Sequence, residues 1–167
     1  MKISLGRRYH FAASHRLHNP KWSTEVNREL YGKCNSPHGH GHNYVLEVAF
    51  TGPVATETGM IANLKELDPF VEREVIEAFD HKYLNEEVPE FRSVVPTTEN
   101  LAREVFRRLR DFPGAKLQRV RIEETSKNSF EFLGEDAGSY RHGRRSQISG
   151  EKQVPHPHPQ EPRLGSG

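Results

Sequence analysis

The sequence predicts an α+β fold in which a four-stranded antiparallel sheet carries two helices on one face. Two segments with alternating apolar residues, 2–15 and 40–51, come before the two longer stretches of helical periodicity. Two more alternating segments, 117–125 and 129–133, follow them. Strand pairs on either side of a helix pair favour an antiparallel sheet with its helices on one side, in the order β-β-α-α-β-β. Such a sheet leaves two open edges, which proteins usually protect or pair with another chain.

Alternation assigns one face of each strand to the core, because residues two apart in a strand point the same way. The apolar face of the first strand carries Ile3, Leu5, Tyr9, Phe11 and Ala13, with His15 at its end; that of the second carries Tyr44, Leu46, Val48 and Phe50 after His40 and His42. Val120 and Ile122 mark this face of the third strand, and Phe130 and Phe132 that of the fourth. A short helix at Thr24–Leu30, stopped by Gly32, is expected between the first two strands.

The first long helix ends near Phe79, and two starts fit the sequence. Asn63 can cap it with Glu66 three residues later, or Asp68 can cap it with Pro69 in the first helical position. Residues 80–96 are expected to be irregular. Thr97 or Thr98 caps the second helix, whose buried face is expected to carry Leu101, Val105 and Leu109.

Composition predicts one domain, residues 1–140, and a disordered tail, 141–167. The tail holds four prolines and four glycines but three aliphatic residues, too few to offset the entropy of ordering it. The rest of the chain has a net charge of −2, which argues against nucleic-acid binding. No apolar run approaches the roughly 20 residues of a membrane span, and the N-terminus lacks the apolar segment of a secretory signal. With a single cysteine, these features predict a cytoplasmic protein without disulfides.

The run His38-Gly39-His40-Gly41-His42 predicts a metal site at the start of the second strand. Alternate imidazoles share one face, and strand pairing can bring His15 beside them. Three neutral imidazoles leave Zn²⁺ a fourth position, which is the pattern of a catalytic site. Spacing alone leaves open whether His38 replaces His40 or His42 as a ligand.

Three further positions have a chemical and a structural interpretation. Cys34, next to Lys33, is a nucleophile or general base if it is a thiolate, and a small buried hydrophobe otherwise. Asp80-His81 is either an acid-base pair or a helix end that favours His. Glu124 shares the apolar parity of its strand, so its two oxygens can bind an adjacent N–H and amino pair such as a 2-aminopyrimidinone, unless strand twist turns it to solvent.

These features together resemble the family of 6-pyruvoyl-tetrahydropterin synthase and 6-carboxytetrahydropterin synthase. The resemblance runs from residue 9 to about 134 and has no counterpart for the tail. The matching stretches are 11–17 (FAASHRL), 32–37 (GKCNSP), 39–44 (GHGHNY), 58–60 (TGM), Leu67, 80–85 (DHKYLN), 96–100 (PTTEN) and 123–125 (EET).

The resemblance implies a role for each candidate residue. The implied roles are zinc ligands at His15, His40 and His42, leaving His38 spare; the catalytic base at Cys34; a proton relay at Asp80 and His81; and pterin binding at Glu124, sometimes counted with the relay, together with Thr97 and Thr98. It also implies the tunnelling fold, in which trimeric barrels stack into a hexamer with active sites between subunits.

The implied activity is that of a zinc-dependent lyase acting on 7,8-dihydroneopterin triphosphate. Its product would be 6-pyruvoyl-tetrahydropterin, for tetrahydrobiopterin synthesis, or 6-carboxy-5,6,7,8-tetrahydropterin, for queuosine synthesis. Five residues separate Cys34 from His40, a spacing that resembles the pyruvoyl enzyme; the carboxy enzyme typically has a shorter one. A non-catalytic zinc or pterin-binding module and a zinc hydrolase are the remoter alternatives. Arg16, Lys33 and Lys127 are candidates for binding the triphosphate because they adjoin the motifs.

Overall fold

A computed structural model describes residues 3–134 of the chain, so the predicted tail at 141–167 lies outside the described residues. The elements are β1 (Ser4–His15), α1 (Thr24–Tyr31), η1 (Gly32–Asn35), β2 (His40–Thr51), α2 (Leu64–Val71), η2 (Glu72–Ile76), α3 (Glu77–Phe79), β3 (Lys82–Tyr83), α4 (Leu84–Glu87), η3 (Pro89–Arg92), α5 (Thr98–Leu109), β4 (Lys116–Thr125) and β5 (Asn128–Leu133). None of the helices described here is long and apolar enough to span a bilayer.

The four long strands form the predicted antiparallel sheet, and a fifth, very short strand extends it. The strand order is β3-β1-β2-β4-β5. Strands β1 and β2 pair along their whole length, from Ser4 opposite Thr51 to His15 opposite His40. The two-residue strand β3 lies parallel to β1 at the outer edge, within the segment predicted to be irregular. Two residues carry no readable alternation, so only their tertiary contact with β1 makes them a strand.

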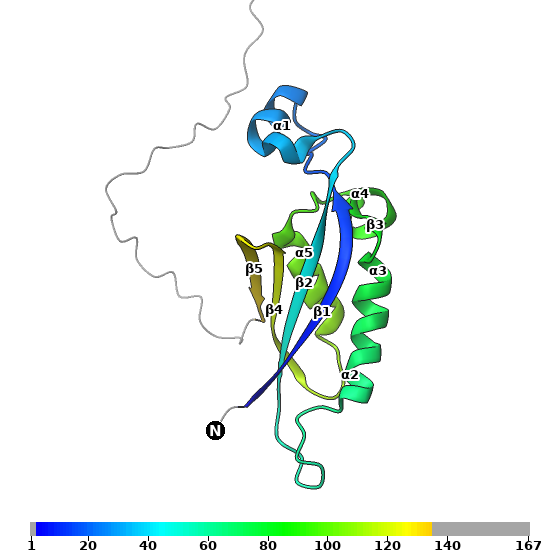
Figure 1. The fold of residues 1–167 in the computed structure, drawn as a ribbon, viewed down its shortest axis with the longest axis vertical. Helices are drawn as coiled ribbons and strands as arrows, with labels where there is room; N and C mark the ends of the chain where they lie inside the picture. The colour runs from blue at the N-terminus through cyan, green and yellow to red at the C-terminus, as the bar shows by residue number, and fades with distance from the viewer. Residues whose placement is uncertain (1–2, 135–167) are drawn as a thin grey trace, which may run out of the picture. The chain divides into compact units, whose positions relative to one another are not determined.

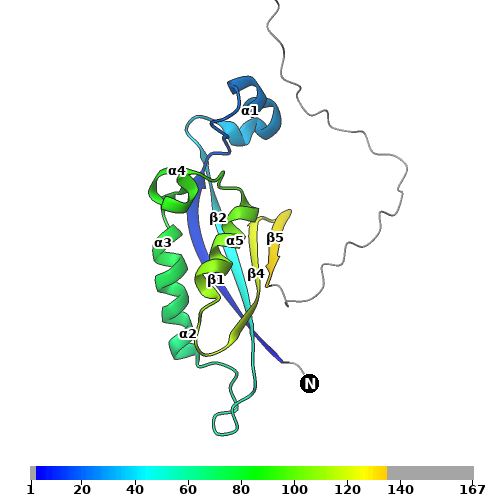
Figure 2. The same ribbon diagram turned by 180° about the vertical axis from the view of Figure 1, so that it is seen from behind.

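The helices cover one face of the sheet, as predicted (Figures 1 and 2). Helix α5 packs against β4 and β5, and α3 contacts β1. The core between these layers includes Phe11, Tyr44, Leu46, Phe50, Leu67, Val71, Val75, Phe79, Leu101, Val105, Leu109, Val120 and Ile122. The prediction for Ile3 is wrong: it precedes β1 and is 49% exposed.

One continuous helical segment, made of α2, η2 and α3, leads from the loop after β2 to Asp80. The Asn63 side chain accepts a hydrogen bond from the Lys65 backbone N–H, so the helix starts at Leu64 and the alternative start at Asp68 is wrong. The Asp68 carboxylate instead accepts hydrogen bonds from Arg7 Nε at 3.1 Å and from the Tyr9 hydroxyl at 2.7 Å. These contacts hold the helix against β1.

The middle of this segment is a π-helical turn, Glu72–Ile76. The buried residues Leu67, Val71, Val75 and Phe79 recur at every fourth position, and a wider turn keeps such a spacing on one face. The segment therefore ends with Phe79 in the core and Asp80 beside β1.

The connection between β1 and β2 lies at the end of the sheet where His15 ends β1 and His40 begins β2. Helix α1 and the 3₁₀ turn η1 stand beyond the end of the strands at which His15 and His40 lie (Figure 1). The sequence left two caps open for α5, and the structure selects Thr97, whose hydroxyl accepts a hydrogen bond from the Asn100 N–H at 3.3 Å.

Candidate active site

Three imidazoles meet where β1 ends and β2 begins. His15 and His40 are opposite one another in the last rung of the β1–β2 ladder, and His42 follows on the same face of β2. The ring centroids lie 4.6 Å (His15–His40), 5.2 Å (His15–His42) and 4.9 Å (His40–His42) apart. One nitrogen from each ring lies within 4.8 Å of the other two, so the three could hold a metal ion. His38 is not part of this group.

The hydrogen bonds around the triad fit a metal. His15 is buried, and its Nδ1 lies 2.7 Å from the Pro96 carbonyl oxygen, an acceptor that fixes the proton on Nδ1. Its Nε2 therefore presents a lone pair, 3.1 Å from His40 Nε2. Nitrogens bound at about 2.0–2.1 Å to a tetrahedral zinc are roughly 3.3 Å apart. His42 Nε2 is buried with no hydrogen-bond partner in the described part of the chain, and a metal would supply one.

Burial favours the neutral form of His15 and His40. It lowers the pKa of His15 to about 4, and the carbonyl of Pro96 offsets part of this effect. Burial and the neighbouring His42 lower the pKa of His40 as well. Because a metal binds the neutral imidazole, both shifts favour metal binding at neutral pH.

Gly39 lets the chain enter β2 at this point. Its φ is +68°, and a Cβ there would lie 2.9 Å from the His15 carbonyl oxygen and 3.1 Å from the Tyr83 ring. Both the left-handed backbone and the close approach exclude a side chain. Gly41 meets no such limit, since its nearest atom, the Ala13 carbonyl oxygen, would be 3.5 Å from a Cβ.

Glu124 lies beside the triad, on the inward side of β4 as its parity predicts. The Thr98 hydroxyl, at the start of α5, donates a hydrogen bond to Glu124 Oε1 at 2.6 Å. That oxygen is 3.8 Å from His15 Nε2 and 3.7 Å from His42 Nε2. Thr97 acts as the helix cap. The structure thus brings together Thr98, Glu124 and the histidines.

Tyr44 lies beside the triad, although the sequence pattern predicts only that it belongs to the core. Its ring centroid is 5.5 Å from that of His42, and its buried hydroxyl has no hydrogen-bond partner in the described part of the chain. Burial, reinforced by the charge of Glu124, raises its pKa, so the hydroxyl keeps its proton. Its position two residues after His42, on the same face, is the signal that could have identified it.

Cys34 lies in η1, and backbone contacts tie this turn to the chain that follows His15. The Leu17 N–H donates a hydrogen bond to the Cys34 carbonyl at 2.9 Å, and the Asn35 side chain donates one to the Leu17 carbonyl at 2.7 Å. Cys34 is half-buried in one copy of the chain.

The Asp80-His81 pair forms a dyad at the edge of β1. Asp80 Oδ2 lies 2.7 Å from His81 Nδ1, and Oδ1 accepts a hydrogen bond from the Ala12 N–H at 2.7 Å. The Ala12 N–H, followed by His81, keeps the pKa of Asp80 below its ordinary value. His81 adopts the left-handed conformation, with φ +57°, and its side chain is 83% exposed. Strain at a non-glycine residue is typical of functional positions.

This dyad is not bonded to the triad in the part of the chain that the structure describes. His81 lines a cavity of about 450 Å³ together with Ala12, Ser14, Gly41 and Asn43, and His42 of the triad is also in its lining. Within residues 3–134, no hydrogen bond, ion pair or ring contact joins Asp80 or His81 to Cys34 or to the triad. Within these residues the dyad and the triad are therefore two separate groups.

Comparisons with known proteins agree with the fold and the motifs. The family model described as 6-pyruvoyl tetrahydropterin synthase matches residues 4–135. The chain is 44% identical, over 75% of its length and 86% of the relative, to a 6-pyruvoyl tetrahydrobiopterin synthase from Poecilia reticulata. The solved structure of Caenorhabditis elegans 6-pyruvoyl tetrahydropterin synthase superposes with a TM-score of 0.77 at 38% identity, covering 81% of this chain and 97% of that one.

A protein of the other product class matches less of the chain. A putative 6-carboxy-5,6,7,8-tetrahydropterin synthase from Archaeoglobus fulgidus is 38% identical over 51% of this chain and 67% of the relative. It is a distant relative of this chain.

Proposed function

Because the chain belongs to the 6-pyruvoyl tetrahydropterin synthase family, we propose that it is a zinc-dependent lyase that converts 7,8-dihydroneopterin triphosphate into 6-pyruvoyl-tetrahydropterin and triphosphate. One observation carries the proposal: a histidine triad fit for a metal lies within 4 Å of a carboxylate suited to a pterin ring. The lyase class and the pterin substrate follow from the names of the relatives, and the site offers the groups that this chemistry needs.

Zinc is the metal we propose for His15, His40 and His42. Three neutral imidazoles with an open position are the donor set of catalytic zinc sites. His15, His40 and His42 would hold the zinc, whose Lewis acidity would polarise the hydroxyl groups of the substrate side chain and make the adjacent carbon more acidic. Comparing the full chain with a His40→Ala variant by elemental analysis tests this, because tail histidines such as His156 are common to both. Equal zinc content in the two would refute it.

Cys34, Glu124 and the dyad have complementary tasks in this proposal. Glu124 accepts hydrogen bonds from the ring N–H and the 2-amino group of the pterin, and Thr98 keeps its carboxylate in place. The Cys34 thiolate accepts the proton that the side-chain carbon loses, while His81, oriented by Asp80, moves protons to and from oxygen. A proton is lost in this way from each of two neighbouring side-chain carbons. The electron pair from the carbon next to the ring reduces the ring, which takes up a proton, and this oxidises the side chain. The pair from the second carbon expels triphosphate from the third, and the resulting enol becomes a ketone, so no external redox cofactor is required.

We also propose that the working enzyme is a hexamer of two stacked trimers. Within residues 3–134 the dyad makes no hydrogen bond or ion pair with the triad or with Cys34, so we expect a second copy of the chain to bring its own dyad to the triad of the first. Light scattering gives the assembly, and mixing inactive Cys34→Ala subunits with inactive His81→Ala subunits tests the sharing. Activity should return if the two residues of a site come from different subunits; no recovery in mixed oligomers would refute it.

The compartment we propose is the cytoplasm, with no nucleic-acid or membrane partner. The base must stay a thiol, which the reducing cytoplasm ensures. Cell fractionation with an antibody to the protein tests this assignment.

Product analysis is the decisive experiment for the activity. The protein is incubated with 7,8-dihydroneopterin triphosphate, and the pterin is identified by mass. We expect the pyruvoyl product, because the Cys34–His40 spacing and the more extensive match favour that enzyme. The carboxy product with released acetaldehyde would establish the alternative, and no turnover would leave a non-catalytic binding module.

A further inference from the structure

A polar cavity beside the triad is lined by positive charge and by no carboxylate. It has a volume of about 360 Å³ and is lined by Arg16, Lys21, Arg92 and His18, among others, but by no Asp or Glu. Small-molecule sites usually measure about 300–1,000 Å³. Within the described part of the chain, Arg16, Lys21 and Arg92 form no ion pair. Three cations around an acid-free hollow attract an anion.

Arg16 is held in place at the wall of this cavity. Its backbone N–H donates to Asn85 Oδ1 at 2.8 Å, and its carbonyl accepts from Asn85 Nδ2 at 2.9 Å. Its Nε donates to the Asn35 carbonyl at 3.1 Å, which leaves the rest of the guanidinium available to a ligand. His18 also lines the cavity, and its Nδ1 lies 3.1 Å from the Asn35 amide nitrogen. Burial lowers the pKa of His18, which favours a neutral imidazole that can still donate one hydrogen bond.

The cavity is linked to the triad and to the turn that holds Cys34. Pro96 lines it and, through its carbonyl, orients His15 of the triad. Arg16 follows His15 directly and contacts Asn35, the neighbour of Cys34. Pro96 and Arg16 thus connect the cavity to the triad and to the turn that holds Cys34.

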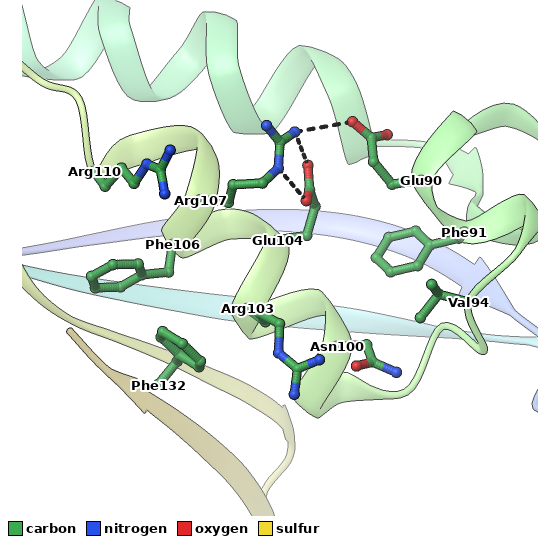
Figure 3. A pocket seen from close by; sticks show the side chains of 10 residues that line it. All are labelled: Glu90, Phe91, Val94, Asn100, Arg103, Glu104, Phe106, Arg107, Arg110 and Phe132. Carbon is green, nitrogen blue, oxygen red and sulfur yellow. Dashed lines mark hydrogen bonds and ion pairs between the residues drawn. The ribbon is translucent and has the colours of Figure 1, made fainter. Parts of the chain in front are cut away.

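A neighbouring cavity differs because carboxylates line it, which is unfavourable for binding an anion. It measures about 470 Å³, and in it Arg107 is bonded to Glu104 at 2.6 and 2.7 Å and to Glu90 at 3.2 Å. Figure 3 shows these groups above the Phe106 and Phe132 rings. There two carboxylates in the lining already bind the Arg107 guanidinium and would repel a polyphosphate, so this cavity is the poorer anion site.

We propose that the cavity lined by Arg16, Lys21 and Arg92 binds the triphosphate group of the substrate. This inference rests on the proposed function, because it identifies the chemical group held at one end of the same site. Arginine and lysine bind phosphate oxygens through charge-assisted hydrogen bonds, and His18 and Asn85 can donate further ones. Of the triphosphate-binding candidates named from the sequence, Arg16 lines this cavity, and the structure adds Lys21 and Arg92.

Charge removal at the two residues farthest from the chemistry tests the assignment. We expect Lys21→Gln and Arg92→Gln each to raise KM for dihydroneopterin triphosphate about ten-fold, as the loss of one charged hydrogen bond predicts. The inhibition constant of inorganic triphosphate should rise by the same factor, and the affinity for dihydroneopterin, which lacks phosphates, should not change. Arg103→Gln, which removes the same charge from the neighbouring cavity, is the matched control.

Direct titration of the full chain with inorganic triphosphate separates this inference from the proposed function. Weaker binding to Lys21→Gln and Arg92→Gln, but not to Arg103→Gln, supports the site even if the chain turns over no pterin. Normal turnover with unchanged KM and unchanged triphosphate inhibition in both variants overturns the site and leaves the function standing. Equal loss of affinity for dihydroneopterin and its triphosphate also overturns it, since the effect would not depend on the phosphates.

Discussion

Removing the metal should expose a pH dependence of folding that originates in His15. The folded-state pKa of His15 is about 4, against 6.5 for the unfolded chain, chiefly because the side chain is buried. Between these values the unfolded chain binds a proton that the folded chain does not, so falling pH favours unfolding. The folding stability associated with neutral His15 is fully present above pH 6.5 and is lost by pH 4. A shift of about two and a half units corresponds to about 3 kcal/mol.

Urea titrations of chelator-treated protein at pH 7 and pH 4 measure this effect. Wild type and an exposed-histidine control on the same strand, His10→Gln, should both lose about 3 kcal/mol more on acidification than His15→Gln does. The His15→Gln variant starts from a lower stability at pH 7, because it also disturbs the bond to Pro96, so only the change with pH is compared. If His15→Gln loses as much stability on acidification as wild type, the burial argument is wrong.

Three further substitutions test individual roles. Cys34→Ala should lower turnover about 10²- to 10⁴-fold, the usual contribution of a general base, while bound zinc stays the same; turnover that persists would remove Cys34 from the chemistry. Glu124→Gln should raise KM for the pterin about ten-fold or more, because the amide has only one acceptor oxygen; an unchanged KM would contradict ring binding there. His81→Ala should lower kcat about 10²-fold or more and leave KM for the pterin unchanged, as expected for a side chain 83% exposed in one copy of the chain. A KM effect of the same size would instead indicate a binding role.

The sequence predicted those parts of the fold that local patterns encode. Alternation located the four long strands, since each has one face in the core and one outside it. The same parity placed His15, His40 and Glu124 on the inward face, where the structure finds them beside one another. Caps were harder to predict, because Asn63 and Asp68 are both good capping residues, and only the tertiary contacts of Asp68 with β1 decide between them.

Features that depend on tertiary contact could not be predicted from the sequence. Strand β3 exists because Lys82 and Tyr83 lie along the edge of β1. The carbonyl that orients His15 belongs to Pro96, 81 residues away, and a backbone oxygen leaves no trace in a motif. The left-handed conformation of His81 is imposed by its backbone bond to Ala12, at 2.6 Å. Nor could spacing reveal that Asp80 bonds to the backbone of β1, since that depends on which edge of the sheet the pair joins.

The geometry around the two glycines of the histidine run implies that selection acts on them unequally. An alanine at position 41 would meet the Ala13 carbonyl at an ordinary contact distance of 3.5 Å within the protomer, whereas one at position 39 would strike the His15 carbonyl at 2.9 Å. In a saturation library screened for function, position 39 should therefore stay invariant while small residues survive at position 41. The glycine directly before His40 is therefore the one that the fold requires, whereas the position between His40 and His42 can vary among small residues.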